Sequence, residues 1–98
     1  MTVFRVTASF AIPIVQMVHG GRRVDTERLK QFWELAVEIA EKPGCYIFSV
    51  RAGKGEKPWY VGKASRQPLS KECFSDHKIV IYDRVIGDHK GAPRLTNV

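Results

Sequence analysis

The chain has 98 residues, of which 44% are hydrophobic and 27% charged, values typical of a globular protein. This length excludes a multidomain protein and predicts one domain over residues 1–98, with a core of modest size. Sixteen Lys and Arg residues against ten Asp and Glu residues give a formal net charge of +6, which favours polyanionic partners such as nucleic acid.

No apolar stretch is long enough to span a membrane, and the first ten residues alternate instead of forming the apolar block of a signal peptide. Cys45 and Cys73 match no metal-binding spacing and are too few for a disulfide framework. We therefore expect a cytoplasmic protein with reduced thiols and no membrane partner.

The N-terminal segment is predicted to begin with a strand. Thr2–Ile12 places apolar residues at alternate positions, the pattern of a half-buried strand. Pro13 cannot donate a hydrogen bond to a ladder, so the strand either lies at a sheet edge or ends there. The following His19–Gly21 segment has the composition of a turn.

Residues 26–42 are predicted to form a helix, capped by Asp25 or Thr26. Lys30 and Glu34 form a pair on its polar side, and the Pro-Gly dipeptide at positions 43–44 ends it. The predicted apolar face consists of Leu29, Phe32, Trp33, Ala36, Val37 and Ala40.

A β-hairpin is predicted next. Cys45–Arg51 is rich in aromatic and β-branched residues and indicates a strand, Ala52–Pro58 is a polar turn, and Trp59–Gly62 is a short second strand. Ala64–Ser70 is expected to be a loop. The order of elements predicts an α+β domain.

The C-terminal third is predicted to hold a second helix, capped by Asp76 and ended by Gly87. The run "IVIY" at positions 79–82 also suits a strand, so both readings stay open. Residues 87–98 show no strong pattern.

Two tyrosines of the hairpin are expected to face one side of the sheet. Residues two apart share a face of a strand, so Tyr60 and Gly62 face together, and Tyr46 can join them from the partner strand. Gly62 would let a phosphate or another backbone come close, and Lys63 would lower a phenol pKa or hold a phosphate. The other reading, which the residues alone favour, is that both tyrosines are edge-of-core residues and Lys63 is solvated.

The two stretches "GCY" (residues 44–46) and "WYVGKA" (residues 59–64) resemble the GIY-YIG nuclease domain, which is named after two such strand motifs. The resemblance implies an α+β fold with a small antiparallel sheet flanked by helices. Residues 44–98 would be its core, and residues 1–43 an N-terminal strand and helix that precede it.

The resemblance also implies the hydrolysis of a phosphodiester bond in DNA with a divalent metal, Mg²⁺ or Mn²⁺. Tyr46 would help to activate the attacking water, while Tyr60 and Lys63 would lie beside the phosphate. Because a phenol ionises near pH 10, neighbouring cations must lower its pKa if it is to act as a base.

The sequence departs from the family pattern at two places. The arginine expected on the following helix is replaced by Lys71, with Arg66 earlier in the loop. The metal-binding glutamate expected after a third strand is missing, since no acidic residue follows Asp88 and the chain ends about where that strand should begin. These departures predict a truncated or divergent member whose metal ligands are unknown. The nearest carboxylates, none at the family position, are Glu72, Asp76 and Asp83.

The segment "SKECFSDHK" resembles a variant within GIY-YIG-like proteins. There His77 would act as a proton shuttle or phosphate ligand, because its pKa is near neutral. The alternative is an ordinary surface histidine at the start of a helix.

Three functions follow as hypotheses. The first is a metal-dependent DNA endonuclease of the GIY-YIG type, with a homodimer through an open sheet edge as one option. The second is an inactive module of the same fold that binds nucleic acid through Gly62, Lys63, Arg66, Lys71 and Lys78. The third is a protein-interaction domain with Trp33 and Trp59 as contacts.

Overall fold

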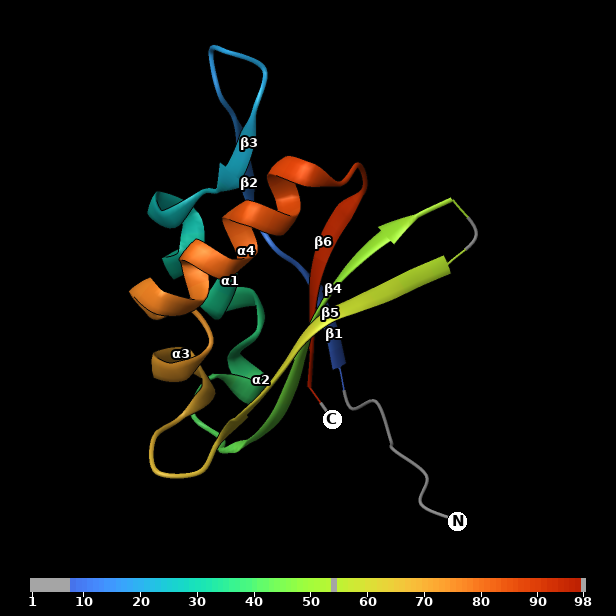
Figure 1. The fold of residues 1–98 in the computed structure, drawn as a ribbon. Coiled ribbons are helices and arrows are strands. Elements are labelled where there is room, and N and C mark those ends of the chain that lie inside the picture. Colours follow the sequence, from blue (N-terminus) through green and yellow to red (C-terminus); the bar gives the residue numbers. More distant parts are fainter. Residues whose placement is uncertain (1–7, 54, 98) are drawn as a thin grey trace.

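The computed structural model describes residues 8–53 and 55–97, and within them six strands form two antiparallel sheets. The strands are β1 (Ala8–Ala11), β2 (Ile14–Gln16), β3 (Arg22–Val24), β4 (Gly44–Ala52), β5 (Gly55–Ala64) and β6 (Ala92–Asn97). The helical segments are η1 (Thr26–Arg28), α1 (Leu29–Leu35), α2 (Val37–Ala40), α3 (Leu69–Glu72) and α4 (Asp76–Asp88). The larger sheet has the order β1-β6-β4-β5, and β2 pairs with β3. The helices gather on one side of the larger sheet (Figure 1), which confirms the α+β class with an antiparallel sheet.

The core lies between that sheet and the helices. One row of cross-strand partners, Phe10, Leu95, Phe48 and Tyr60, crosses all four strands on the helix-facing side. Tyr82 of α4 stacks on Phe48 with ring centroids 4.3 Å apart. Aromatic packing of this kind fixes α4 against the middle of the sheet.

Residues 87–98, for which the sequence showed no strong pattern, contain β6, which is a central strand of the larger sheet. It pairs with β1 on one side and with β4 on the other. Pro93 argues against a central strand and Arg94 interrupts its apolar pattern. The backbone of β6 is held by pairing with β1 and β4. The sequence of residues 92–97 gives no sign of these two neighbouring strands. A strand therefore follows α4 in this chain.

The helix predicted over residues 26–42 is divided into η1, α1 and α2. Ala36 leaves the helical conformation, with φ −96° and ψ 31°, so the residues after it no longer continue the apolar face. Ile39 is consequently buried, whereas Val37, predicted in the core, is 67% exposed. The ion pair expected between Lys30 and Glu34 is not among those within the described residues.

The hairpin has longer strands than predicted. β5 begins at Gly55, so most of the expected turn over Ala52–Pro58 belongs to strands. Glu56 and Lys57 are exposed on this edge strand, where polar side chains do not oppose strand formation. The expected loop after Ala64 ends at Pro68, the N-cap residue of α3.

The segment "IVIY" lies in a helix, α4, which resolves the choice between helix and strand. Ser75 is its N-cap residue and Asp76 its first residue, and Gly87 lies within its last turn instead of ending it. Because α4 buries Tyr82 and Ile86 four residues apart, it packs as an amphipathic helix.

The predicted turn over His19–Gly21 joins β2 and β3, a hairpin that sequence patterns did not indicate. The guanidinium of Arg22 in β3 donates hydrogen bonds to the carbonyl oxygens of Ile86 (3.2 Å), His89 (2.7 Å) and Gly91 (2.8 Å). A cation at a helix C-terminus is favourable, so Arg22 ties this hairpin to the end of α4.

Candidate functional site

The strand register brings the two motif tyrosines together on the helix-facing side of the sheet. Tyr46 pairs with Gly62 and Phe48 pairs with Tyr60. The rings of Tyr46 and Tyr60 lie 6.2 Å apart between centroids. Partners directly opposite in an antiparallel pair share a face, so the predicted common orientation of the tyrosines is confirmed.

Gly62 serves a different purpose from the one predicted. A Cβ at this position would lie 2.3 Å from Cζ of Tyr46 and 2.4 Å from its hydroxyl oxygen. The space above Gly62 is therefore filled by the ring of Tyr46, and no phosphate can approach the glycine from that side.

Tyr46 is completely buried, and its hydroxyl has no hydrogen-bond partner among the described residues. Burial raises the pKa of Tyr46 to about 12, although Lys78 acts in the opposite direction. The expectation that neighbouring cations lower this pKa is wrong, because the loss of hydration outweighs the nearby charge. At neutral pH Tyr46 is a neutral phenol that can donate a hydrogen bond.

Lys78 of α4 is the cation that lies beside the tyrosines. Its Nζ is 5.7 Å from the ring centroid of Tyr60 and donates to Oε1 of Glu72 at 3.0 Å. Gln67 donates to the other carboxylate oxygen of Glu72 at 2.6 Å. The hydrogen bond with Glu72 raises the pKa of Lys78 and lowers the pKa of Glu72. We call Tyr46, Tyr60, Glu72 and Lys78 the tyrosine–lysine cluster.

Lys63 does not reach this cluster. It pairs with Cys45 in the hairpin register, and successive residues of a strand point to opposite faces. Lys63 is therefore exposed on the face opposite Tyr46 and Tyr60. Its predicted place beside the hydroxyls is wrong, and Lys78 has that place instead.

The other predicted site residues are dispersed. His77 is exposed in the first turn of α4, where it follows Asp76 and precedes Lys78. Arg66 and Lys71 are exposed in the loop before α3 and in α3 itself. The structure brings none of these three side chains into hydrogen-bond contact with the tyrosines, within the described residues.

The sequence did not predict the ion pair between Glu72 and Lys78. Glu72 ends α3, and a short connection over residues 73–75 separates it from α4. Glu72 and Lys78 are six residues apart, a spacing that no single helix would bring together. The ion pair therefore depends on how α3 and α4 are oriented relative to each other.

The described carboxylates do not fit a metal site. Residues 8–53 and 55–97 hold no group of three His, Cys, Asp or Glu residues that could bind an ion. Glu72 is occupied by Lys78 and Gln67, and Asp83 accepts a hydrogen bond from the backbone N–H of Val24 at 2.8 Å. The implied Mg²⁺ or Mn²⁺ thus has no ligand set in the part of the chain described.

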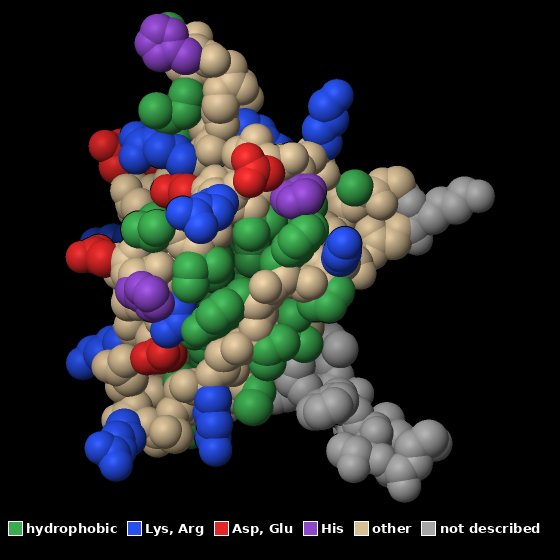
Figure 2. Space-filling model, in the orientation of Figure 1, with side chains coloured by type: hydrophobic (Ala, Val, Ile, Leu, Met, Phe, Trp, Pro, Cys, Tyr) green, Lys and Arg blue, Asp and Glu red, His purple; other side chains and the backbone are tan. Residues whose placement is uncertain are grey.

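Apolar and basic side chains meet over this region of the surface. Figure 2 shows hydrophobic side chains gathered in a band between α4 and the β4–β5 hairpin, with Lys and Arg side chains on both sides. Trp59 and Tyr60 are half-buried, and the side chains of Lys78 and Glu72 are 13% and 22% exposed. The cluster is thus partly open to solvent through Tyr60 and Lys78, with Tyr46 behind them.

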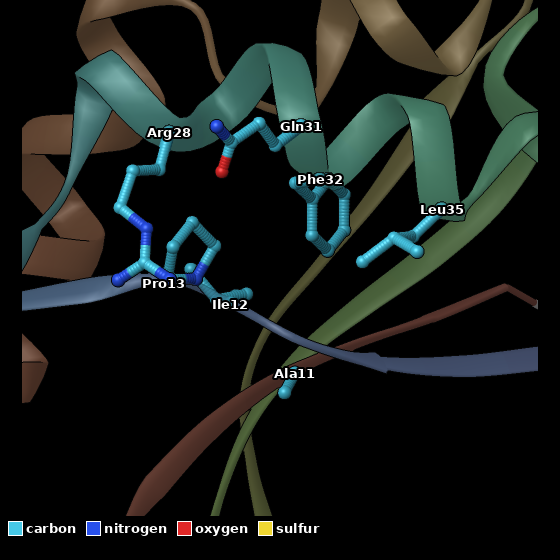
Figure 3. Close-up of a pocket in the computed structure, with 7 residues that line it drawn as sticks. All are labelled: Ala11, Ile12, Pro13, Arg28, Gln31, Phe32 and Leu35. Atoms are coloured by element: carbon cyan, nitrogen blue, oxygen red, sulfur yellow. The ribbon is translucent and has the colours of Figure 1, made fainter.

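Hollows elsewhere on the molecule are separate from the cluster. One of about 220 Å³ lies between α1 and the end of β1 (Figure 3), and none of the predicted site residues lines it. Another, of about 200 Å³, includes Arg66 and Gln67. A third, of about 360 Å³, lies between the β2–β3 turn and the end of α4. The tyrosine–lysine cluster is a surface and lines none of them.

Comparison with protein-family models, with curated proteins and with solved structures finds no match to this chain. Among the described residues, no helix has the length and apolar character needed to cross a membrane.

The stability of the protein is expected to fall at alkaline pH because of Tyr46. Between pH 10, where the unfolded chain loses this proton, and about 12, the folded state keeps it. The free energy of unfolding therefore falls across this window, by at most about 1.4 kcal/mol per pH unit for one proton. Below pH 10 this contribution is constant.

Urea denaturation from pH 9 to 11.5 measures this effect. Burial also raises the pKa of Cys73 and Tyr82, so Tyr46→Phe should reduce the slope above pH 10 without removing it. An identical slope in Tyr46→Phe would show that Tyr46 ionises normally in the folded protein.

Proposed function

We propose that this chain is a domain of the GIY-YIG type that holds a DNA backbone at the tyrosine–lysine cluster and hydrolyses a phosphodiester bond there. The observation that carries the proposal is the convergence of Tyr46, Tyr60 and Lys78 on one side of the hairpin. The succession of β4, β5, the helices α3 and α4, and β6 supports it, because the resemblance implies two strands, a helical part and a third strand in that order.

The shape of the cluster favours an extended ligand over a small molecule. Small ligands usually occupy concave pockets, whereas the cluster is a partly open surface beside an apolar band. A formal net charge of +6 favours a polyanion. A nucleic-acid strand satisfies both conditions.

Lys78 is the residue that would meet the phosphate first. Its ammonium can donate to a phosphate oxygen in place of the Glu72 carboxylate. One hydrogen bond between charged groups is then replaced by another. Tyr60, half-buried and next to Lys78, would contact the same phosphate. Tyr46 is completely buried, so its neutral hydroxyl would donate to the substrate only once Tyr60 and Lys78 have moved aside; its pKa of about 12 keeps its proton in place at neutral pH.

Hydrolysis requires that a water oxygen attacks phosphorus, that one phosphorus–oxygen ester bond breaks, and that a proton reaches the leaving oxygen. The metal implied by the resemblance has no ligand set among the described residues, so we assign no step to it. The same finding, together with the buried neutral Tyr46, favours a second candidate: a module of this fold that binds nucleic acid without cleaving it.

Nicking of supercoiled plasmid in Mg²⁺ or Mn²⁺ tests hydrolysis. Loss of a positioned proton donor or acceptor typically costs about 10²- to 10⁴-fold in rate, so Tyr60→Phe and Tyr46→Phe should each lower nicking at least about 100-fold. Unchanged nicking in both variants would refute the assigned roles. Binding without nicking in either metal would favour the second candidate.

Binding is tested separately by its salt dependence. Lys78→Met should reduce the slope of log K against log salt concentration by about one, the effect of a lost phosphate contact. Lys30→Met is the matched control, since it removes the same charge from an exposed position on α1. Equal slopes in the two variants would show that Lys78 does not contact the nucleic acid. No binding at low salt would leave the protein-interaction hypothesis.

A further inference from the structure

Trp59 occupies an irregular position in the hairpin. The register pairs Phe48 with Tyr60 and Ser49 with Pro58, so Trp59 is an extra residue on β5. Such a bulge bends the strand and redirects a side chain. The indole of Trp59 lies against the ring of His89, which follows α4, with centroids 4.3 Å apart and planes 31° apart.

A cation completes this arrangement. Nζ of Lys57 lies 4.7 Å from the ring centroid of Trp59. Among the described residues, neither the Lys57 ammonium nor the His89 imidazole makes a hydrogen bond or ion pair with another side chain. Both residues are exposed and Trp59 is half-buried. The contacts on the indole can therefore be exchanged for another flat ring.

An aromatic ring flanked by basic residues is the combination that binds single-stranded nucleic acid. Bases stack on aromatic side chains while cations follow the backbone, and a cation over an aromatic face adds to the attraction. Trp59 directly precedes Tyr60, and because the bulge redirects its side chain, its ring contacts His89 at the end of α4 and so lies on the helix-facing side, like Tyr60. A nucleotide whose phosphate lies at Tyr60 and Lys78 would have its base within reach of the indole.

We propose that Trp59, with His89 and Lys57, is a stacking site for an unpaired base next to the phosphate held by the tyrosine–lysine cluster. This inference rests on the proposed function and specifies its substrate class. A base inside a duplex has both faces covered by its neighbours, so the site selects single-stranded DNA or a strand at a flap or junction over plain duplex.

Tryptophan fluorescence gives a direct test. The chain has two tryptophans, and Trp33→Phe leaves Trp59 as the only indole. Three ligands are compared at equal phosphate number: oligo(dT), the same backbone without bases, and duplex DNA. We expect oligo(dT) to quench Trp59 fluorescence strongly and to bind more tightly than the abasic strand, which should leave the fluorescence nearly unchanged.

Trp59→Leu provides the energetic test. Removal of a stacking aromatic residue should weaken oligo(dT) binding by about 5- to 150-fold, while abasic binding should change little. Trp59→Phe keeps an aromatic face and should restore part of the affinity, which separates stacking from a loss of folding.

The outcomes separate this inference from the proposed function. If the Trp33→Phe protein binds abasic strand and oligo(dT) equally, or if Trp59→Leu weakens both equally, the stacking site is refuted. The phosphate contact at Lys78 can still hold in that case. If none of the three ligands binds at low salt, the stacking site and the proposed function both fail.

Discussion

Replacing Gly62 with alanine is expected to destabilise the protein by about 3 kcal/mol, in the upper part of the range for overpacked cores. The added Cβ would lie 2.3 Å from Cζ of Tyr46. Tyr46 is completely buried, so its ring can move only by displacing other core residues. Urea denaturation measures the change in the free energy of unfolding, and the proposed nicking activity should fall with it because Tyr46 leaves its place.

A double-mutant cycle assigns this effect to the contact with Tyr46. Leucine at position 46 ends short of Cζ, so Gly62→Ala should cost less than about 1 kcal/mol in a Tyr46→Leu background, a coupling of about 2 kcal/mol. Gly87→Ala is the matched control, because nothing lies within 4 Å of a Cβ there and alanine favours the helix by about 0.5 kcal/mol. Strict additivity in the cycle would contradict the proposed contact.

Replacing Tyr82 with alanine should have the largest effect on stability, about 4 kcal/mol. Tyr82 is completely buried and stacks on Phe48, and its hydroxyl donates to the carbonyl oxygen of Cys73 at 2.8 Å. Its ring also packs edge-on against the ring of Tyr60, with the centroids 6.3 Å apart. The substitution therefore removes the ring contacts of α4 with Phe48 and Tyr60, and with them the support behind the tyrosine–lysine cluster.

A second substitution at Tyr82 separates the stability contributed by its ring from that of its hydroxyl, and a substitution at Val80 serves as the control. Tyr82→Phe keeps the ring and loses one hydrogen bond, so it should cost about 1 kcal/mol. Val80→Ala, on the same helix but 63% exposed, should change stability by less than about 0.5 kcal/mol. Chemical denaturation of the three variants measures their free energies of unfolding, and Tyr82→Ala should be the least stable and Val80→Ala the most stable. If Tyr82→Ala were as mild as Val80→Ala, α4 would not be fixed to the sheet through this ring.

The elements that could be predicted are those with a strong local pattern. Aromatic and β-branched residues predicted β4, and helical spacing predicted α1. At α4 the sequence left both a helix and a strand open. The break at Ala36 had no such signal, because alanine is the residue that most favours a helix. β6 was missed for a related reason: Pro93 and Arg94 weaken its own pattern, and its stability comes from β1 and β4.

The candidate site was predicted in part. Tyr46 and Tyr60 follow from the alternation of side chains along two adjacent strands, which is a local rule. Lys63 was placed beside them by proximity in sequence, but the same alternation puts it on the other face. Lys78 comes from a helix that docks on the sheet from elsewhere in the chain, so no spacing rule connects it with the hairpin.

The sequence by itself determined the α+β composition, the basic charge and the position of two tyrosines on one face of a hairpin, because these depend on residues close together in the chain. Only the tertiary structure decided that Tyr46 fills the space over Gly62, loses its hydration and stays protonated. It also decided that Glu72 and Lys78 meet in front of Tyr60 and that β6 lies inside the sheet. Burial, strand order and helix docking set these features, and each of them depends on segments that are distant in sequence and adjacent only after folding.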